Sequence, residues 1–400
     1  MPAADLDAFA HRVEAFFEEH AKRAPERHSW GDGPDDVVAS ALSPGREEES
    51  DIEEAREFQR ALFDAGLAWI DGPIELGGAG GTAAHVDTFR RIARDYETPD
   101  LSVFMIGQRI VAPAIAGFGT PDQQQRWLRA IWRGDSIACQ LFSEPDAGSD
   151  LASLRCRAIR DGDGWRISGQ KVWSSGAHLS DVGELLARTE EDPSLRHRGL
   201  SMFLVDMHAP GVTVRPLRQM NGNAHFNEVY LEDVHVPEAA LLGERGGGWA
   251  VANASLTSER DLGPDDHGLF LEPVERLLEL ARVRGAAARP DVRQELADTY
   301  ARDVIGRLLE ERLRHAAPEV AAVAMSLTKL YGAQSMWRLA QRAARILGPN
   351  ITADTGAWGE YCWAYLVLGV HSQRIAGGTD EIQRNIIGER ALGLPRDPRP

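Results

Sequence analysis

Two short polar stretches carry residue types suited to binding a planar ligand rich in heteroatoms. Residues 140–150 combine a proline-fixed turn with small residues, which let backbone N–H groups approach a ligand closely. Residues 169–175 place Trp173 beside the hydroxyls of Ser174 and Ser175. An indole can stack on a planar ring, and hydroxyls can hydrogen-bond its heteroatoms. Taken alone, each stretch could equally be an ordinary turn at the end of a strand.

The elements around these stretches change character twice along the chain. Residues 1–135 show mostly helical spacing, and the sequence from Thr120 to Gln123 predicts a helix start with a capping box. Between about 136 and 243 the apolar period becomes two, with a hairpin predicted over 156–167 and the last strand ending at Val236-Pro237. Helical spacing then returns. We expect an α+β protein with an N-terminal all-α domain (1–135), a middle β domain (136–243) and a C-terminal all-α domain (244–400).

Charge and composition exclude several classes of protein. The formal net charge of −17 argues against nucleic acid or an anionic membrane as the main partner, although a local arginine cluster could still hold a phosphorylated ligand. The three cysteines include no CxxC pair, and the histidines, His225 among them, lack metal or triad spacing, so no metal site is predicted. No apolar run reaches membrane-spanning length, and the first residues do not form a signal peptide. A cytoplasmic protein is expected.

A glycine-rich run at 77–81 invites comparison with a phosphate-binding loop. It lacks both the preceding buried strand and the Lys-Ser/Thr ending of that motif. We interpret it as a structural turn.

Together, the two polar stretches resemble the flavin-binding loops of the acyl-CoA dehydrogenase family, and the resemblance extends over nearly the whole chain. In that family these loops hold the isoalloxazine ring of FAD. Residues 378–384 resemble the C-terminal segment that touches its adenosine half. The resemblance therefore implies FAD contacts from Gln140, Leu141, Phe142, Ser143, Gly148, Ser149, Trp173, Ser174, Ser175, Thr379 and Glu381.

The segments that resemble the family's pyrophosphate-binding elements depart from its pattern. The usual Arg-x-x-Phe-Gly element, which a neighbouring subunit supplies in that family, corresponds to residues 281–285, which keep arginines, Arg284 among them, but lose the phenylalanine. The glutamine before the second glycine-rich element corresponds to Arg345, three residues before Gly348. Arg345 could serve a phosphate or be a solvated helix arginine. Such changes occur in branches where unlike subunits share FAD.

The reaction implied by the resemblance is dehydrogenation of an acyl-CoA to the trans-2-enoyl-CoA. A carboxylate removes the α proton while the β hydride passes to flavin N5. Many members carry this base where the present chain has Gly377, whereas the long-chain and isovaleryl branches carry it on a helix segment that resembles residues 256–260, with Glu259 at the matching position. The Gly377 N–H would donate to the thioester oxygen. From spacing alone, Glu259 could equally be an exposed helix glutamate. Implied substrate contacts are Ser149, Thr257, Arg260, Gly377 and Gly378.

The resemblance also implies partners. Electrons would pass to an electron-transfer flavoprotein, and the long apolar helix faces after residue 244 suggest a homodimer or homotetramer, or a heteromer with a paralogue. Two alternatives stay open: a non-catalytic or FAD-sharing subunit of a heteromeric dehydrogenase, and a flavin oxidase or monooxygenase on the same fold. Base placement on the helix suggests long or branched acyl groups. The acidic stretch 261–267 receives no function.

Overall fold

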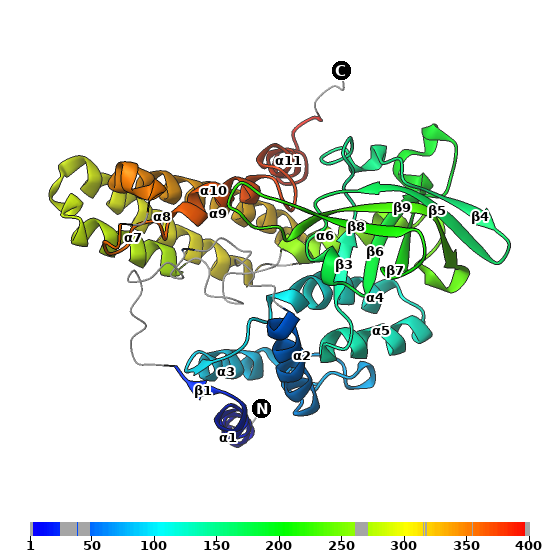
Figure 1. Ribbon diagram of the computed structural model, residues 1–400, viewed down its shortest axis with the longest axis horizontal. Helices are drawn as coiled ribbons and strands as arrows, with labels where there is room; N and C mark the ends of the chain where they lie inside the picture. The colour runs from blue at the N-terminus through cyan, green and yellow to red at the C-terminus, as the bar shows by residue number, and fades with distance from the viewer. Residues whose placement is uncertain are drawn as a thin grey trace. The chain divides into compact units, whose positions relative to one another are not determined.

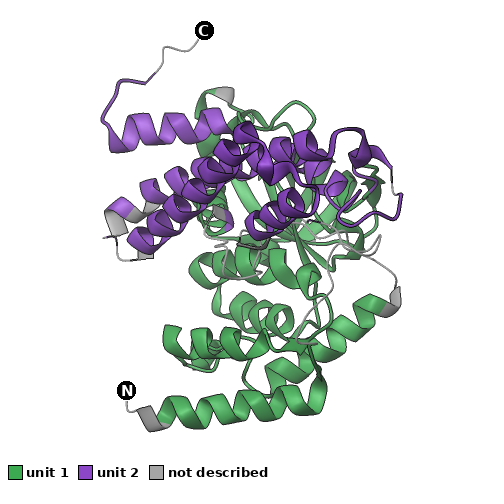
Figure 2. Ribbon diagram, turned by 90° about the vertical axis from the view of Figure 1, so that its left-hand side faces the viewer, with its two compact units in different colours: residues 1–28, 45–219, 223–258 green, residues 29–44, 220–222, 259–400 purple. Residues whose placement is uncertain are grey.

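The structure is a computed structural model that describes residues 3–24, 38, 49–260, 271–314, 316, 318–353 and 355–396, so the acidic stretch 261–267 lies outside the described residues. The chain forms two compact units (Figures 1 and 2). Unit 1 comprises residues 1–28, 45–219 and 223–258, and unit 2 comprises residues 29–44, 220–222 and 259–400. Helices and a mixed sheet confirm the predicted α+β class.

Unit 1 begins with helices that enclose an aromatic core. Phe17 packs against Tyr96 with ring centroids 5.0 Å apart. The capping box predicted at Thr120 is confirmed, because its hydroxyl accepts from Gln123 N and the Gln123 side chain accepts from Thr120 N. The α-helices of this unit are α1 (Ala3–His20), α2 (Glu49–Asp64), α3 (Ala83–Ala93), α4 (Ala112–Phe118), α5 (Pro121–Arg133) and α6 (Gly248–Arg260), the last two residues of α6 being assigned to unit 2.

The glycine-rich run at 77–81 is a turn, as the sequence predicts. Its N–H groups donate to backbone carbonyls of residues 69–74, among them those of Ile70, Pro73 and Ile74. A phosphate loop needs N–H groups directed at the ligand. Here those groups are already bonded within the turn.

The middle of unit 1 is an eight-stranded sheet. Its order is β10-β7-β6-β4-β5-β9-β8, with β3 parallel to β6. The predicted hairpin over 156–167 is confirmed by the pairing of β4 with β5. The prediction that Val236-Pro237 ends the series is wrong, because β10 follows and pairs with β7. The strands are β3 (Ala138–Leu141), β4 (Arg157–Asp161), β5 (Gly164–Lys171), β6 (Val182–Arg188), β7 (Leu200–Asp206), β8 (Val212–Leu217), β9 (Phe226–Pro237) and β10 (Leu241–Leu242), and a separate ribbon pairs β1 (Lys22–Arg23) with β2 (Tyr96–Glu97).

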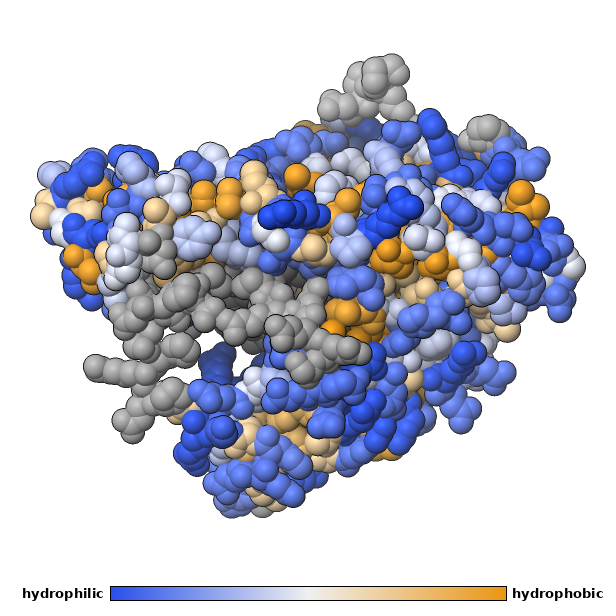
Figure 3. Space-filling model, viewed as in Figure 1, coloured by the Kyte–Doolittle hydropathy of each residue, from blue (hydrophilic) through white to orange (hydrophobic). Residues whose placement is uncertain are grey.

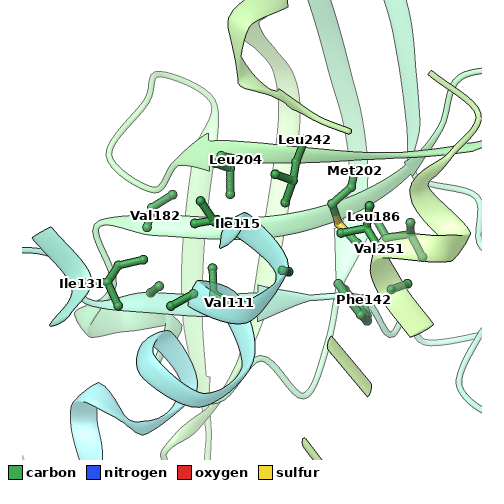
Figure 4. Close-up of a cluster of buried hydrophobic side chains, with 14 of the residues drawn as sticks. Val111, Ile115, Ile131, Phe142, Val182, Leu186, Met202, Leu204, Leu242 and Val251 are labelled. Atoms are coloured by element: carbon green, nitrogen blue, oxygen red, sulfur yellow. The ribbon is translucent and has the colours of Figure 1, made fainter. Parts of the chain in front are cut away.

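The two faces of the sheet are buried in different cores. Side chains alternate along a strand, so Val182 and Leu186 of β6 share one face, and Leu185 lies on the other. The first face joins the cluster drawn in Figure 4, which includes Ile115 of α4 and Val251 of α6. Helices α4, α5 and α6 therefore cover this face of the sheet, and β6 is buried on both sides.

Unit 2 is helical. Its core contains Leu277, Leu280, Leu339 and Trp363. The return of helical spacing after residue 244 is confirmed by three long helices, and between Ala364 and Arg374 a short α-helix is followed by a 3₁₀ segment. The described helices are α7 (Leu271–Val283), α8 (Pro290–Arg314), α9 (Pro318–Leu347), α10 (Ala364–Gly369), the 3₁₀ segment Val370–Arg374, α11 (Asp380–Ile386) and a π-helical turn (Ile387–Ala391).

Several large apolar side chains of unit 2 reach the surface, and Figure 3 shows orange atoms among the hydrophilic ones. Five of them lie on α8 and α9: Tyr300, Ile305, Leu308, Val320 and Leu327. Within the described ranges, no helix is both long and apolar enough to cross a bilayer.

Candidate active site

The structure brings the two polar loops of unit 1 side by side. Val172 N donates to Ser143 O at 2.9 Å, and Lys171 Nζ donates to Phe142 O at 3.0 Å. Both contacts join the end of β5 to the loop that follows β3. The backbone around Phe142 and Ser143 is therefore fixed relative to Trp173.

A buried ion pair reinforces this junction. Lys171 Nζ lies 2.9 Å from Glu144 Oε1, and the two side chains are 0% and 7% exposed. The Glu144 carboxylate also accepts from the backbone N–H groups of Arg155 and Cys156, at 2.7 and 2.8 Å. Hydrogen bonds from these two side chains thus tie three chain segments together. Sequence reasoning missed both residues, although an isolated charge at the end of an apolar strand is the signal that marks them.

Trp173 and Ser174 present groups that fit a planar, heteroatom-bearing ring. Trp173 is 60% exposed and adopts φ 62°, a left-handed conformation that a bulky residue rarely takes. Its ring meets Phe226 edge-on, with centroids 5.8 Å apart. The Ser174 hydroxyl is buried and has no hydrogen-bond partner among the described residues. An exposed indole beside an unsatisfied hydroxyl suits the isoalloxazine end of FAD.

Asn227 holds this second loop from β9. Its side-chain amide donates to Ser174 O at 2.9 Å, while its backbone carbonyl oxygen accepts from Ser174 N at 3.1 Å. The residue is fully buried. Asn227 is a third positioning residue that the sequence analysis did not identify.

The remaining predicted residues of the first loop differ in which of their groups a ligand could contact. Leu141 and Phe142 are buried in the cores of unit 1, so only their backbone can reach a ligand. Gln140 is half-buried in β3, and its Nε2 has no partner among the described residues. Gly148 and Ser149 are exposed. In the second loop, Ser175 is half-buried.

The predicted base lies in the last turn of α6. Glu259 is half-buried there. Thr257 donates its hydroxyl to Asn253 O at 2.7 Å, one turn back in the same helix. The Arg260 side chain lies outside the described residues.

The glycine pair that follows Ala376 adopts a conformation natural to glycine. Gly377 has φ 63° and Gly378 has φ 91°. Gln383 Nε2 donates to both of their carbonyl oxygens, at 2.8 and 3.1 Å, and Lys329 Nζ donates to Gly378 O at 2.7 Å. A side chain at either position would strain the backbone, so this segment is built to present peptide groups.

Helix α11 begins immediately after this pair. Thr379 is its N-cap and accepts from Ile382 N at 3.2 Å, so its hydroxyl serves the helix. Asp380 is buried against Arg374, with 2.8 Å between Nη2 and Oδ2. Glu381 is exposed and lies 3.6 Å from Arg384.

The arginines predicted at the FAD pyrophosphate are already paired within unit 2. Arg284 Nη2 lies 3.0 Å from the buried carboxylate of Glu360. Bonds from Thr355 and then Arg284 lower the pKa of Glu360 to about 2. Arg345, at the end of α9, pairs with Glu295 and also with Asp291.

Gly348 follows α9 with φ 56°, and a Cβ there would meet open space. The role of Gly348 in binding FAD stays a prediction. So does the role of the two arginines, each of which is directed at a carboxylate in the structure.

Two other kinds of chemistry find no support in the described part of the chain. It contains no group of three His, Cys, Asp or Glu side chains that could hold a metal ion. Burial raises the pKa of the Cys139 thiol to about 12 and that of Cys156 to about 11. Neither thiol therefore supplies a nucleophilic thiolate at neutral pH.

Comparisons with known proteins point to one family from residue 4 to residue 392. Family models for the acyl-CoA dehydrogenase N-terminal, middle and C-terminal domains match residues 4–135, 139–234 and 246–392. The acyl-CoA dehydrogenase IpdE1 of Mycobacterium tuberculosis is 40% identical over 360 residues, which cover 88% of this chain and 91% of the relative.

Solved structures of the same kind share the fold. The Tcur3481-Tcur3483 steroid ACAD has a TM-score of 0.76 and 26% identity, covering 99% of this chain and 99% of its own. The ChsE4-ChsE5 complex from Mycobacterium tuberculosis has a TM-score of 0.73 and 26% identity, covering 99% of both chains.

Proposed function

Because the chain belongs to the acyl-CoA dehydrogenase family, a family of FAD-dependent oxidoreductases, we propose that it converts an acyl-CoA to the trans-2-enoyl-CoA with Glu259 as the base. The observation that carries the proposal is the arrangement of the two polar loops of unit 1. There the exposed Trp173 adjoins the unsatisfied hydroxyl of Ser174, on a backbone fixed by a buried ion pair. FAD, when bound, supplies the acceptor for the β hydrogen and its electron pair.

The residues of unit 1 would hold the flavin ring. Trp173 offers its face, Ser174 and Ser175 offer hydroxyls, and the loop at 140–149 offers backbone groups near Phe142 and Ser143. Gly148 and Ser149 are both exposed, and Ser149 would also contact the CoA. Thr379 and Glu381 at the start of α11 would serve the adenosine half, Thr379 through its backbone, because its hydroxyl caps the helix.

The chain's own contribution to the chemistry is to move one proton and to polarise one carbonyl. Glu259 would accept the α proton. The Gly377 N–H would donate to the thioester oxygen, which makes that proton acidic enough to remove. Thr257, Arg260 and Gly378 would line the substrate path.

Bulky acyl groups are the substrate class we favour. The placement of the base on a helix suggests long or branched chains, and one similar solved structure is named a steroid ACAD. We therefore extend the proposal to steroid-derived acyl-CoA thioesters. Electrons would then pass to an electron-transfer flavoprotein.

A second candidate is an FAD-sharing subunit of a heteromer, which one observation favours. Arg284 and Arg345, the arginines expected at the pyrophosphate, are each bound to carboxylates of their own unit. One similar solved structure is a complex of two named chains, ChsE4 and ChsE5. The exposed apolar side chains on α8 and α9 support assembly with a further subunit, identical or not.

The visible spectrum of the purified chain separates these candidates. A yellow protein that acyl-CoA bleaches anaerobically supports the dehydrogenase reaction. A colourless protein that gains flavin and activity only when co-expressed with a paralogue supports the FAD-sharing subunit. Formation of hydrogen peroxide without an added acceptor would instead indicate an oxidase.

Glu259→Gln tests the base. We expect the variant to keep its flavin spectrum and to lose bleaching by acyl-CoA, because an amide cannot accept the α proton. Glu244→Gln, at an exposed position away from the loops, is the matched control and should bleach normally. Unchanged bleaching in the Glu259 variant would remove this residue from the mechanism.

A further inference from the structure

A carboxyl group that the sequence analysis did not single out lies inside the apolar core of unit 1. Glu184 in β6 is 0% exposed. Its neighbours on the same face of the strand, Val182 and Leu186, belong to the cluster of Figure 4, as does Leu204 opposite it on β7. Among the described residues, no ion pair includes Glu184. An unpaired charge in such a place would be very costly, so the site favours a neutral carboxylic acid.

Hydrogen counting leads to the same protonation state. Ser255 Oγ lies 2.7 Å from Glu184 Oε1 and 3.2 Å from Val251 O. A serine hydroxyl has one hydrogen, and a backbone carbonyl can only accept. A neutral Glu184 that donates to Ser255, with Ser255 donating to Val251, makes both contacts full hydrogen bonds, whereas an ionised Glu184 would leave one hydroxyl hydrogen shared between two acceptors. Burial raises the pKa of Glu184 to about 8, in keeping with this arrangement.

The second carboxyl oxygen faces a complementary group. Gln140 pairs with Glu184 in the parallel register of β3 and β6, so their side chains lie on the same face. Glu184 Oε2 and Gln140 Nε2 are both buried, and neither has a hydrogen-bond partner among the described residues. One is an acceptor and the other a donor. A small side-chain rotation or one bridging water would join them.

We propose that Glu184, as a neutral acid, is a positioning residue that anchors α6 through Ser255 and β3 through Gln140, and so sets the place of Glu259. This inference rests on the proposed role of Glu259. Ser255 and Glu259 are four residues apart, so they lie one above the other on one face of α6. The 2.7 Å hydrogen bond of Ser255 adds a directional constraint on the rotation and height of this helix to the apolar packing of Val251.

Within the described part of the chain, no charged group is found to act on Glu184. From α6 come Ser255, Val251 and Ala252, from β3 comes Gln140, and from β7 comes Leu204. All of these are uncharged. The Cys139 thiol lies on the opposite face of β3, and its own burial keeps its pKa near 12, well above the range in which Glu184 titrates.

Infrared spectroscopy tests the protonation state without any catalysis. The difference spectrum between the wild type and Glu184→Gln should show a protonated carboxyl band at about pH 6 that is lost at about pH 9.5. A wild-type spectrum without that band at about pH 6 would overturn the neutral acid.

Stopped-flow bleaching by acyl-CoA tests positioning. Ser255→Ala and Glu184→Leu should slow bleaching by about tenfold to a hundredfold, the usual effect of a displaced reacting group, with little change in thioester affinity. Glu184→Gln keeps the hydrogen bonds, so it should bleach at nearly the wild-type rate and lack the wild-type decline above about pH 8. Normal bleaching by both disrupting variants would overturn positioning.

Glu259→Gln, measured in the same series, separates the two claims. If that variant bleaches normally, the proposed base fails, while the infrared band still reports on Glu184. If it is inactive and Ser255→Ala is fully active, only the positioning inference fails. Far-ultraviolet circular dichroism and the flavin spectrum confirm that each variant is folded.

Discussion

Replacing Lys171 by methionine should loosen the junction of the two polar loops of unit 1. Methionine fills much of the same space but leaves the buried Glu144 carboxylate without its cation. Removing one partner of a buried ion pair commonly costs about 3–5 kcal/mol. Glu144 would keep its bonds from the backbone N–H groups of Arg155 and Cys156. We therefore expect the free energy of unfolding to fall by an amount near the lower end of this range, about 3 kcal/mol. Because Lys171 also holds Phe142 O, flavin content should fall as well.

Chemical denaturation followed by circular dichroism measures the loss. The double variant Glu144→Gln/Lys171→Met removes both charges, so it should lose less than the sum of the single variants. Arg155→Met is the matched control from the same loop: its pair with Asp146 is 3.5 Å long with side chains 81% and 76% exposed, and surface pairs contribute only about 0–1 kcal/mol. A Lys171→Met loss no larger than that of the control, or strict additivity in the double variant, would refute the reasoning.

Three further changes test other parts of unit 1. Folding raises the pKa of Glu184 from 4.5 to about 8, so the stability that its neutral form contributes is complete below about pH 4.5 and is lost as the pH rises to about 8. The difference in free energy of unfolding between the wild type and Glu184→Gln should therefore fall by about 1.4 kcal/mol per pH unit over that range, and a flat difference in denaturation midpoints would contradict it. Trp173→Ala should weaken FAD binding by about 1 kcal/mol, followed by fluorescence titration, with Trp173→Phe retaining part of the stacking. Gln123→Ala removes the bonds to Thr120 N, Ala239 O and Leu241 O, so it should lower the free energy of unfolding by about 2 kcal/mol without changing the flavin spectrum.

Features encoded by neighbouring residues could be predicted from the sequence. The capping box at Thr120 needs only four residues, and its hydrogen bonds form within one helical turn. The hairpin over 156–167 follows from alternation and a glycine-rich turn. The two polar loops could be recognised because their residue types are contiguous, and the structure places the two loops together.

Features that depend on distant partners could not be predicted. Strand β6 lies at the centre of the sheet, yet Gly183 and Glu184 interrupt its apolar run, and burial on both faces removes the alternating pattern. Lys171 and Glu144 are 27 residues apart, and nothing local to either shows that the other will neutralise it. The partner of Arg284 lies far along the chain at Glu360, so sequence pattern alone offered a phosphate as its counter-ion.

Ser174 and Arg284 differ in what a ligand that binds to them would displace. In unit 1 the Ser174 hydroxyl is buried without a partner in the described chain, so a ligand that bonds to it removes a cost already present in the protein. In unit 2 Arg284 already has a buried carboxylate, and a pyrophosphate would have to compete with Glu360 for it. Separating that pair would leave Glu360 charged and buried. We therefore expect a flavin ring to gain from the Ser174 hydroxyl, whereas a pyrophosphate would gain from Arg284 only at the expense of its pair with Glu360.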